Sequence, residues 1–152
     1  QRGGVSIAFI QVSDTRIGAP KFNKADVVLA LSERAIARTS AYSDENTLFV
    51  YDSSFKIDPD ELPRQVKRII ALPAIDTANS ELHPRVFNII IMGAVIGLTN
   101  VVGFDSAKEA LENKLGYKFE SNPELRTLNY KALEIGKELA IKSLQEGVFN
   151  HA

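Results

Sequence analysis

Three short runs of this chain are apolar on both of their alternating faces. They cover Val5–Ser13, Ala25–Leu31 and Thr47–Tyr51. Successive side chains of a β-strand point to opposite faces, so strands made from these runs must be covered on both sides. Such cover is typical of parallel sheets with helices packed on both faces. The runs therefore predict three strands of a buried, mostly parallel sheet.

The segments between and after these runs predict helices, and the helices gather toward the C-terminal end of the chain. In the last of them, apolar residues recur at spacings of three and four. The expected helices cover 32–40, 75–82, 84–100, 107–115 and 124–145, and a fourth short strand covers 68–73. Strands that alternate with helices indicate an α/β fold, and 152 residues suit a single domain over 1–152.

Composition excludes several classes of protein. With 18 Lys and Arg against 19 Asp and Glu, the formal charge is -1, so no basic surface for nucleic acid or anionic membrane is expected. The chain has no Cys, which excludes disulfides, thiolate zinc sites and iron–sulfur clusters ligated by this chain. Only His83 and His151 could supply imidazole ligands, so we predict no metal site.

The segment from Pro84 to Asn100 is strongly apolar, and its extension to Phe104 reaches membrane-spanning length. Gly93 and Gly97 have the GxxxG spacing that lets membrane helices pack closely. Polar residues within the segment favour instead a buried helix of an α/β domain. We then expect the two glycines to allow close contact with the sheet or with a partner subunit.

One short segment and one side chain could have a binding role that is not catalytic. Arg2-Gly3-Gly4 precedes the first run, where glycines let a backbone approach a ligand or subunit and Arg2 could bind an anion. The alternative is a flexible lead-in to a strand. Asn88 is a lone amide on the apolar helix and needs hydrogen-bond partners, in the core or at a ligand or subunit boundary.

No segment combines a nucleophile with a base. Ser53-Ser54 lack the G-x-S-x-G context of a hydrolase, and nothing beside His83 supplies a nucleophile or an orienting partner. The phosphate-binding patterns G-x-G-x-x-G and G-x-x-x-x-G-K-[ST] are absent. We therefore predict no catalytic residue in this chain.

Four motifs, in order, resemble the gamma subunits, or gamma domains, of 2-oxoacid:ferredoxin oxidoreductases, the pyruvate/2-oxoglutarate:acceptor oxidoreductase family. Arg2-Gly3-Gly4 with residues 8–14 is similar to the family's R-G-G-x-x-x-A-x-h-x-h-S-D stretch, where h is apolar. The other three are residues 25–32 (A-D-h-h-h-A-L), 72–74 (h-P-A) and 84–94 (P-R-h-x-N-h-h-h-h-G-A). The residues given before Arg2 do not include the family's G-x-G-G-Q-G loop or its flanking elements, so the N-terminal glycine-rich portion is either absent or lies upstream of the sequence shown.

The resemblance implies a Rossmann-like three-layer sandwich with a mostly parallel sheet and a long C-terminal helix. It implies a gamma-type subunit that supports the CoA-dependent oxidative decarboxylation of a 2-oxoacid, pyruvate or 2-oxoglutarate. Thiamine diphosphate, Mg, CoA and [4Fe-4S] clusters are expected in the whole complex, with none held by this chain alone. A stand-alone Rossmann-like nucleotide-binding module is the alternative.

The resemblance also implies partners and a place for the candidate residues. Alpha, beta and delta subunits are the expected partners, with ferredoxin as an indirect one; nucleic acid and membrane are not expected. A homodimer is the alternative for the isolated chain. Arg2, Gly3, Gly4 and Asn88 become cofactor-binding or subunit-boundary residues. The expected setting is the cytoplasm.

Overall fold

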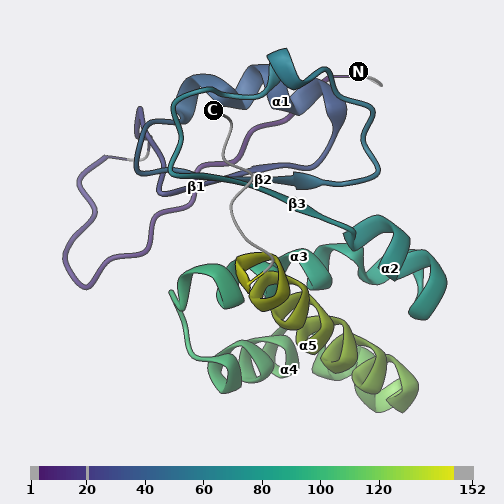
Figure 1. The fold of residues 1–152 in the computed structure, drawn as a ribbon. Helices are drawn as coiled ribbons and strands as arrows, with labels where there is room; N and C mark the ends of the chain where they lie inside the picture. The colour runs from purple at the N-terminus through teal and green to yellow at the C-terminus, as the bar shows by residue number, and fades with distance from the viewer. Residues whose placement is uncertain (1–3, 20, 146–152) are drawn as a thin grey trace. The chain divides into compact units, whose positions relative to one another are not determined.

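The computed structural model describes residues 4–19 and 21–145 of the chain. Two compact units divide it, Gln1–Ala71 and Leu72–Ala152, and each is described here by itself (Figure 1). The single domain expected over 1–152 stays a prediction.

The first unit contains a three-stranded sheet in the order β1-β2-β3. Its strands are β1 (Val27–Ala30), β2 (Leu48–Asp52) and β3 (Arg68–Leu72). Strands β1 and β2 are parallel, and Val27 pairs with Leu48. Each strand begins and ends within two residues of its predicted bounds. The parallel pairing confirms the α/β class expected from the sequence.

Helix α1 (Glu33–Thr39) follows β1 and packs against it. Two short 3₁₀ turns, η1 (Ser40–Tyr42) and η2 (Pro59–Glu61), complete the regular elements of this unit. Its core combines buried side chains from β1, α1 and β2, namely Val28, Ala30, Ala35, Ile36 and Phe49. Val50, which follows Phe49 and so points to the other face of β2, is also buried. This strand is covered on both faces, as its apolar pattern predicts.

The prediction of a buried strand over Val5–Ser13 is wrong. The segment belongs to no strand of the sheet, and 79% of Ile10 and 65% of Val12 are exposed. A strand needs a neighbour for its backbone N–H and C=O groups, and none of the described residues forms a ladder with this segment. The apolar pattern therefore identified side chains that could be buried on both faces of the segment. It did not show whether other elements pack against those faces.

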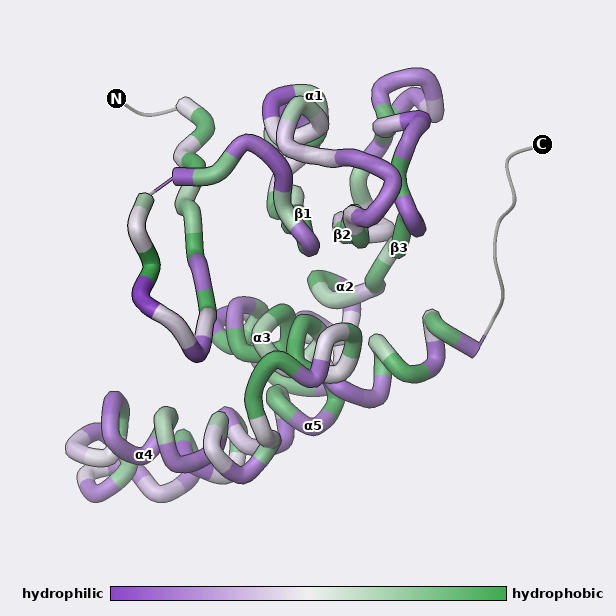
Figure 2. The backbone as a smooth tube through the Cα atoms, turned by 90° about the vertical axis from the view of Figure 1, so that its left-hand side faces the viewer, coloured by the Kyte–Doolittle hydropathy of each residue, from purple (hydrophilic) through white to green (hydrophobic). Residues whose placement is uncertain are grey.

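The second unit is helical, and its elements lie close to their predicted positions. They are α2 (Ala74–Glu81), η3 (Pro84–Val86), α3 (Phe87–Thr99), α4 (Phe104–Ser121) and α5 (Pro123–Gln145). The long C-terminal helix is confirmed, and α4 extends beyond the predicted 107–115 at both ends. Helices α3 and α4 both pack against α5, and Figure 2 shows α3 as predominantly hydrophobic. Within residues 4–19 and 21–145, no helix has the length and apolarity needed to cross a membrane.

Glycines bring α3 and α5 into backbone contact. A β-carbon added at Gly93 would collide with the Leu133 carbonyl, and one added at Gly136 would collide with the Ile90 carbonyl. One turn further along α3, a β-carbon at Gly97 would lie 3.0 Å from the Lys137 carbonyl oxygen. The close contact predicted for the Gly93–Gly97 pair is confirmed. The contact that the structure shows is with α5, a helix of the same unit, whereas the sequence pointed to the sheet or a partner subunit.

Candidate functional site

The N-terminal candidate residues are only partly within the described structure. Arg2 and Gly3 lie outside the described residues. Gly4 is exposed, and a β-carbon added there would meet nothing within 4 Å. Its neighbours within this chain therefore do not require a glycine at this position. Its assignment to a ligand or subunit boundary stays a prediction.

Phe9 and Val5 hold the segment after Gly4 against the rest of the first unit. Phe9 forms edge-to-face pairs with Phe22, with ring centroids 5.2 Å apart, and with Tyr42, at 5.1 Å. Edge-to-face pairs of this kind place the positive ring edge against the negative ring face. Val5 packs against the core of the same unit. The alternation of the sequence put Phe9 on one face of the segment but did not single it out as the anchor.

The opposite face of this segment is apolar and exposed. It carries Ala8, Ile10 and Val12, which alternate with the inward-facing Phe9 and Gln11. The Gln11 side chain donates a hydrogen bond to the Ala19 carbonyl oxygen at 2.8 Å, which closes the following loop. The segment therefore combines a fixed inner face with an uncovered apolar outer face.

Asn88 lies in the first turn of α3 and is exposed. The sequence predicted an amide that needs hydrogen-bond partners, either in the core or at a ligand or subunit boundary. Its side chain is exposed in this chain. Water can therefore hydrogen-bond to the amide, and no desolvation penalty has to be offset by partners in the core. Gly4 and Asn88 belong to different units, and each is described within its own unit. A ligand or boundary role for Asn88 stays a prediction.

His83 has a structural position at the start of the same helical region. Its Nδ1 accepts a hydrogen bond from the backbone N–H of Arg85 at 3.1 Å and so caps η3. This contact ties up one ring nitrogen in a backbone bond. His83 thereby serves the entry into α3, where Pro84 begins the turn.

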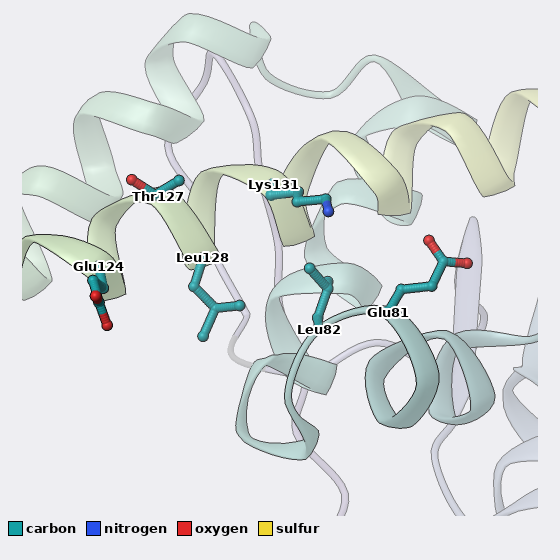
Figure 3. A pocket seen from close by; sticks show the side chains of 6 residues that line it. All are labelled: Glu81, Leu82, Glu124, Thr127, Leu128 and Lys131. Atoms are coloured by element: carbon teal, nitrogen blue, oxygen red, sulfur yellow. The ribbon is translucent and has the colours of Figure 1, made fainter.

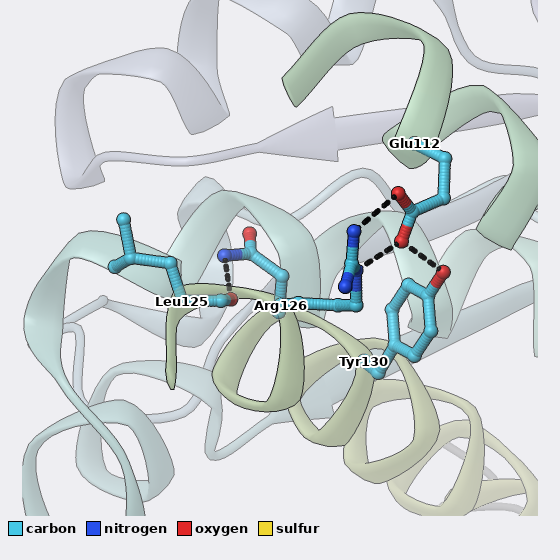
Figure 4. Close-up of polar contacts among 5 residues, drawn as sticks. Glu112, Leu125, Arg126 and Tyr130 are labelled. Carbon is cyan, nitrogen blue, oxygen red and sulfur yellow. Dashed lines mark hydrogen bonds and ion pairs between the residues drawn. The ribbon is translucent and has the colours of Figure 1, made fainter. Parts of the chain in front are cut away.

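A polar cluster that the sequence did not predict joins α4 to α5. Arg126 donates from Nε to Glu112 Oε1 at 2.7 Å and from a terminal nitrogen to Oε2 at 3.2 Å. The Tyr130 hydroxyl donates to Glu112 Oε1 at 2.6 Å (Figure 4). One carboxylate on α4 thus receives three hydrogen bonds from two side chains on α5. Arg126 and Tyr130 are four residues apart and share a helix face, which was the available signal.

These contacts stabilise the ionised form of Glu112. The Tyr130 hydrogen bond, followed by that of Arg126, lowers the pKa of Glu112 below its ordinary value of 4.5. The same bonds raise the pKa of Arg126 and of Tyr130. A carboxylate that stays ionised at neutral pH is a poor proton donor for catalysis. The cluster is suited to fastening two helices.

A second set of charged contacts runs alongside this cluster. Lys108 Nζ lies 2.8 Å from Glu134 Oε1 and above the rings of Phe104 and Tyr130, at 5.1 and 5.4 Å from their centroids. Lys137 Nζ lies 4.8 Å from the Phe104 ring centroid. The charges at the α4–α5 junction are therefore engaged with one another and with aromatic rings.

The second unit also carries an open depression of about 340 Å³ between the end of α2 and α5 (Figure 3). Leu82 and Leu128 supply its apolar lining, and Glu81, Glu124, Thr127 and Lys131 supply its polar lining. Two carboxylates against one ammonium group make a poor seat for the phosphates of CoA or thiamine diphosphate. The depression therefore does not fit either cofactor of the expected complex.

Metal ligands are not gathered in the described parts of the chain. Across residues 4–19 and 21–145, no three His, Asp or Glu side chains come together in a group that could hold a metal ion. The chain also has no Cys with which to ligate an iron–sulfur cluster. The residues present therefore do not fit the clusters of the expected complex.

Comparison with known proteins identifies the family. The family model described as pyruvate ferredoxin/flavodoxin oxidoreductase matches residues 1–139. The chain belongs to this family. Membership confirms the resemblance found in the four sequence motifs.

The relatives of this chain differ in the share of their own length that the match covers. The 2-oxoglutarate synthase subunit KorC of Methanocaldococcus jannaschii is 29% identical over 91% of this chain and 73% of its own length. The ketoisovalerate oxidoreductase subunit VorA of Methanothermobacter marburgensis is 27% identical over 98% of this chain. This chain spans only 30% of VorA.

Two solved structures share the fold. A keto/oxoacid ferredoxin oxidoreductase gamma subunit from Geobacter sulfurreducens matches with TM-score 0.65 and 27% identity, over 82% of this chain and 67% of its own. The 2-oxoglutarate:ferredoxin oxidoreductase of Magnetococcus marinus, with 2-oxoglutarate, coenzyme A and succinyl-CoA bound, matches with TM-score 0.73 and 28% identity. That match covers 86% of this chain and 22% of the Magnetococcus chain. The matches support a gamma-type domain and do not favour a stand-alone nucleotide-binding module.

Proposed function

We propose that this chain is the gamma-type part of a 2-oxoacid:ferredoxin oxidoreductase. In that role it supports the CoA-dependent oxidative decarboxylation of a 2-oxoacid by the complex. The observation that carries this proposal is the family match over residues 1–139. The KorC match supports it, because the match covers 73% of a protein that is itself named as a subunit of a 2-oxoglutarate synthase.

The arrangement of the chain suits a supporting role. The polar cluster around Glu112 joins two helices, and the glycine contacts of α3 and α5 fix the helical unit internally. Thiamine diphosphate, Mg and iron–sulfur clusters would then be held by alpha, beta and delta subunits, with electrons passed to ferredoxin. Thiamine diphosphate supplies the carbanion chemistry of the decarboxylation in such complexes.

Among 2-oxoacids, 2-oxoglutarate is the first to test and pyruvate the second. Relatives named for 2-oxoglutarate recur among the matches, including KorC of Archaeoglobus fulgidus, 30% identical over 99% of this chain. VorA is named for ketoisovalerate, so a branched-chain oxoacid belongs in the same panel. The proposed setting is the cytoplasm, where ferredoxin is available as electron acceptor.

Reconstitution of the complex tests the proposal. The chain is coexpressed without oxygen with its candidate alpha, beta and delta subunits, and the complex is purified through a tag on another subunit. We expect the chain to copurify. We also expect it to raise viologen reduction that depends on both CoA and the oxoacid. Equal activity with and without the chain would refute the supporting role.

Two variants of the chain make this experiment specific. Gly116→Ala should fold and restore activity, because the nearest atom to a β-carbon there is a carboxylate oxygen of Glu112 at 3.9 Å. Gly93→Ala should fail to restore it, because the β-carbon would collide with the Leu133 backbone and disrupt the helical unit. Size-exclusion chromatography of the chain alone decides whether it forms a homodimer when isolated.

A further inference from the structure

We draw no further inference here: the strongest candidate, the exposed apolar face that Ala8, Ile10 and Val12 form on the segment after Gly4, carries none because nothing in the structure shows what covers it.

Discussion

Gly93 of α3 lies directly against the backbone of Leu133 in α5. A β-carbon at position 93 would come 2.9 Å from the Leu133 carbonyl carbon and closer still to its oxygen. Gly136 makes the reciprocal approach, since a β-carbon there would lie 2.9 Å from the Ala94 nitrogen. Neither obstacle is the flexible end of a side chain. The two helices must therefore move apart if either glycine acquires a side chain.

Gly93→Ala should consequently destabilise the protein, by about 1–3 kcal/mol or more, because overpacking against backbone forces the helices to shift. The matched control is Gly116→Ala in α4, where the space is open and alanine favours the helix by roughly 0.5–1 kcal/mol. The free energy of unfolding from urea titration measures both. Equal effects of the two substitutions would show that the glycines are not needed for the α3–α5 contact.

The sequence predicted the positions of helices and strands better than it predicted the contacts between them. The runs that became β1 and β2 were predictable because a parallel strand covered on both faces is apolar on both faces, but Val5–Ser13 has the same pattern and forms no strand. The GxxxG pair Gly93 and Gly97 predicted a close approach, and Gly136 with Ala140 has the same spacing on α5. Nothing in either pattern said that these two helices would pack together, because pairing depends on the tertiary arrangement.

The candidate site was less predictable, for two physical reasons. Asn88 was expected to find partners in the core or at a ligand or subunit boundary, but hydropathy along a helix does not tell which side of its first turn faces water. The partner of Arg126 is Glu112, fourteen residues away on another helix, and no local spacing reports such a contact. Only the shared helix face of Arg126 and Tyr130 was visible beforehand.

The Glu112 cluster predicts a pH dependence of stability. The folded-state pKa of Glu112 is lowered below its ordinary 4.5, so the unfolded chain binds this proton more readily. The stabilisation is then fully present above about pH 4.5 and is lost as pH falls through the lowered pKa. The difference in melting temperature between the wild type and Glu112→Gln should therefore shrink as pH is lowered from 6 toward 3.

Two further variants make the pH test specific. Tyr130→Phe removes the hydrogen bond that contributes most to lowering the pKa of Glu112, so it should weaken the pH dependence while the Arg126 bonds remain. Glu109→Gln, on an exposed side chain of the same helix, should leave the profile parallel to the wild type. A Glu112→Gln profile parallel to the wild type would contradict the role of this carboxylate.

Phe9 should carry most of the attachment of the N-terminal segment. Removing its ring in Phe9→Ala loses two edge-to-face pairs, each worth about 0.5–1.5 kcal/mol, together with the buried ring area. Ile10→Ala, at a side chain that is 79% exposed, should change the free energy of unfolding by about 0.5 kcal/mol or less. Proteolysis after Arg16 should accelerate in the first variant and not in the second. Equal acceleration in both would show that the segment is not anchored by its inner face.

Removal of the Ser43 hydroxyl and removal of the Thr47 hydroxyl, in the same loop, should have opposite effects on stability. The Ser43 hydroxyl is buried and finds no hydrogen-bond partner among the described residues. The Thr47 hydroxyl donates to the Ala25 carbonyl at 2.6 Å and accepts from the Asp44 N–H at 2.9 Å.

Thr47→Val leaves both backbone groups without this partner and should cost about 1–3 kcal/mol, whereas Ser43→Ala removes an uncompensated polar group. Urea titration should therefore place Ser43→Ala at or above the wild type in stability. A loss in Ser43→Ala as large as in Thr47→Val would show that the Ser43 hydroxyl has a partner after all.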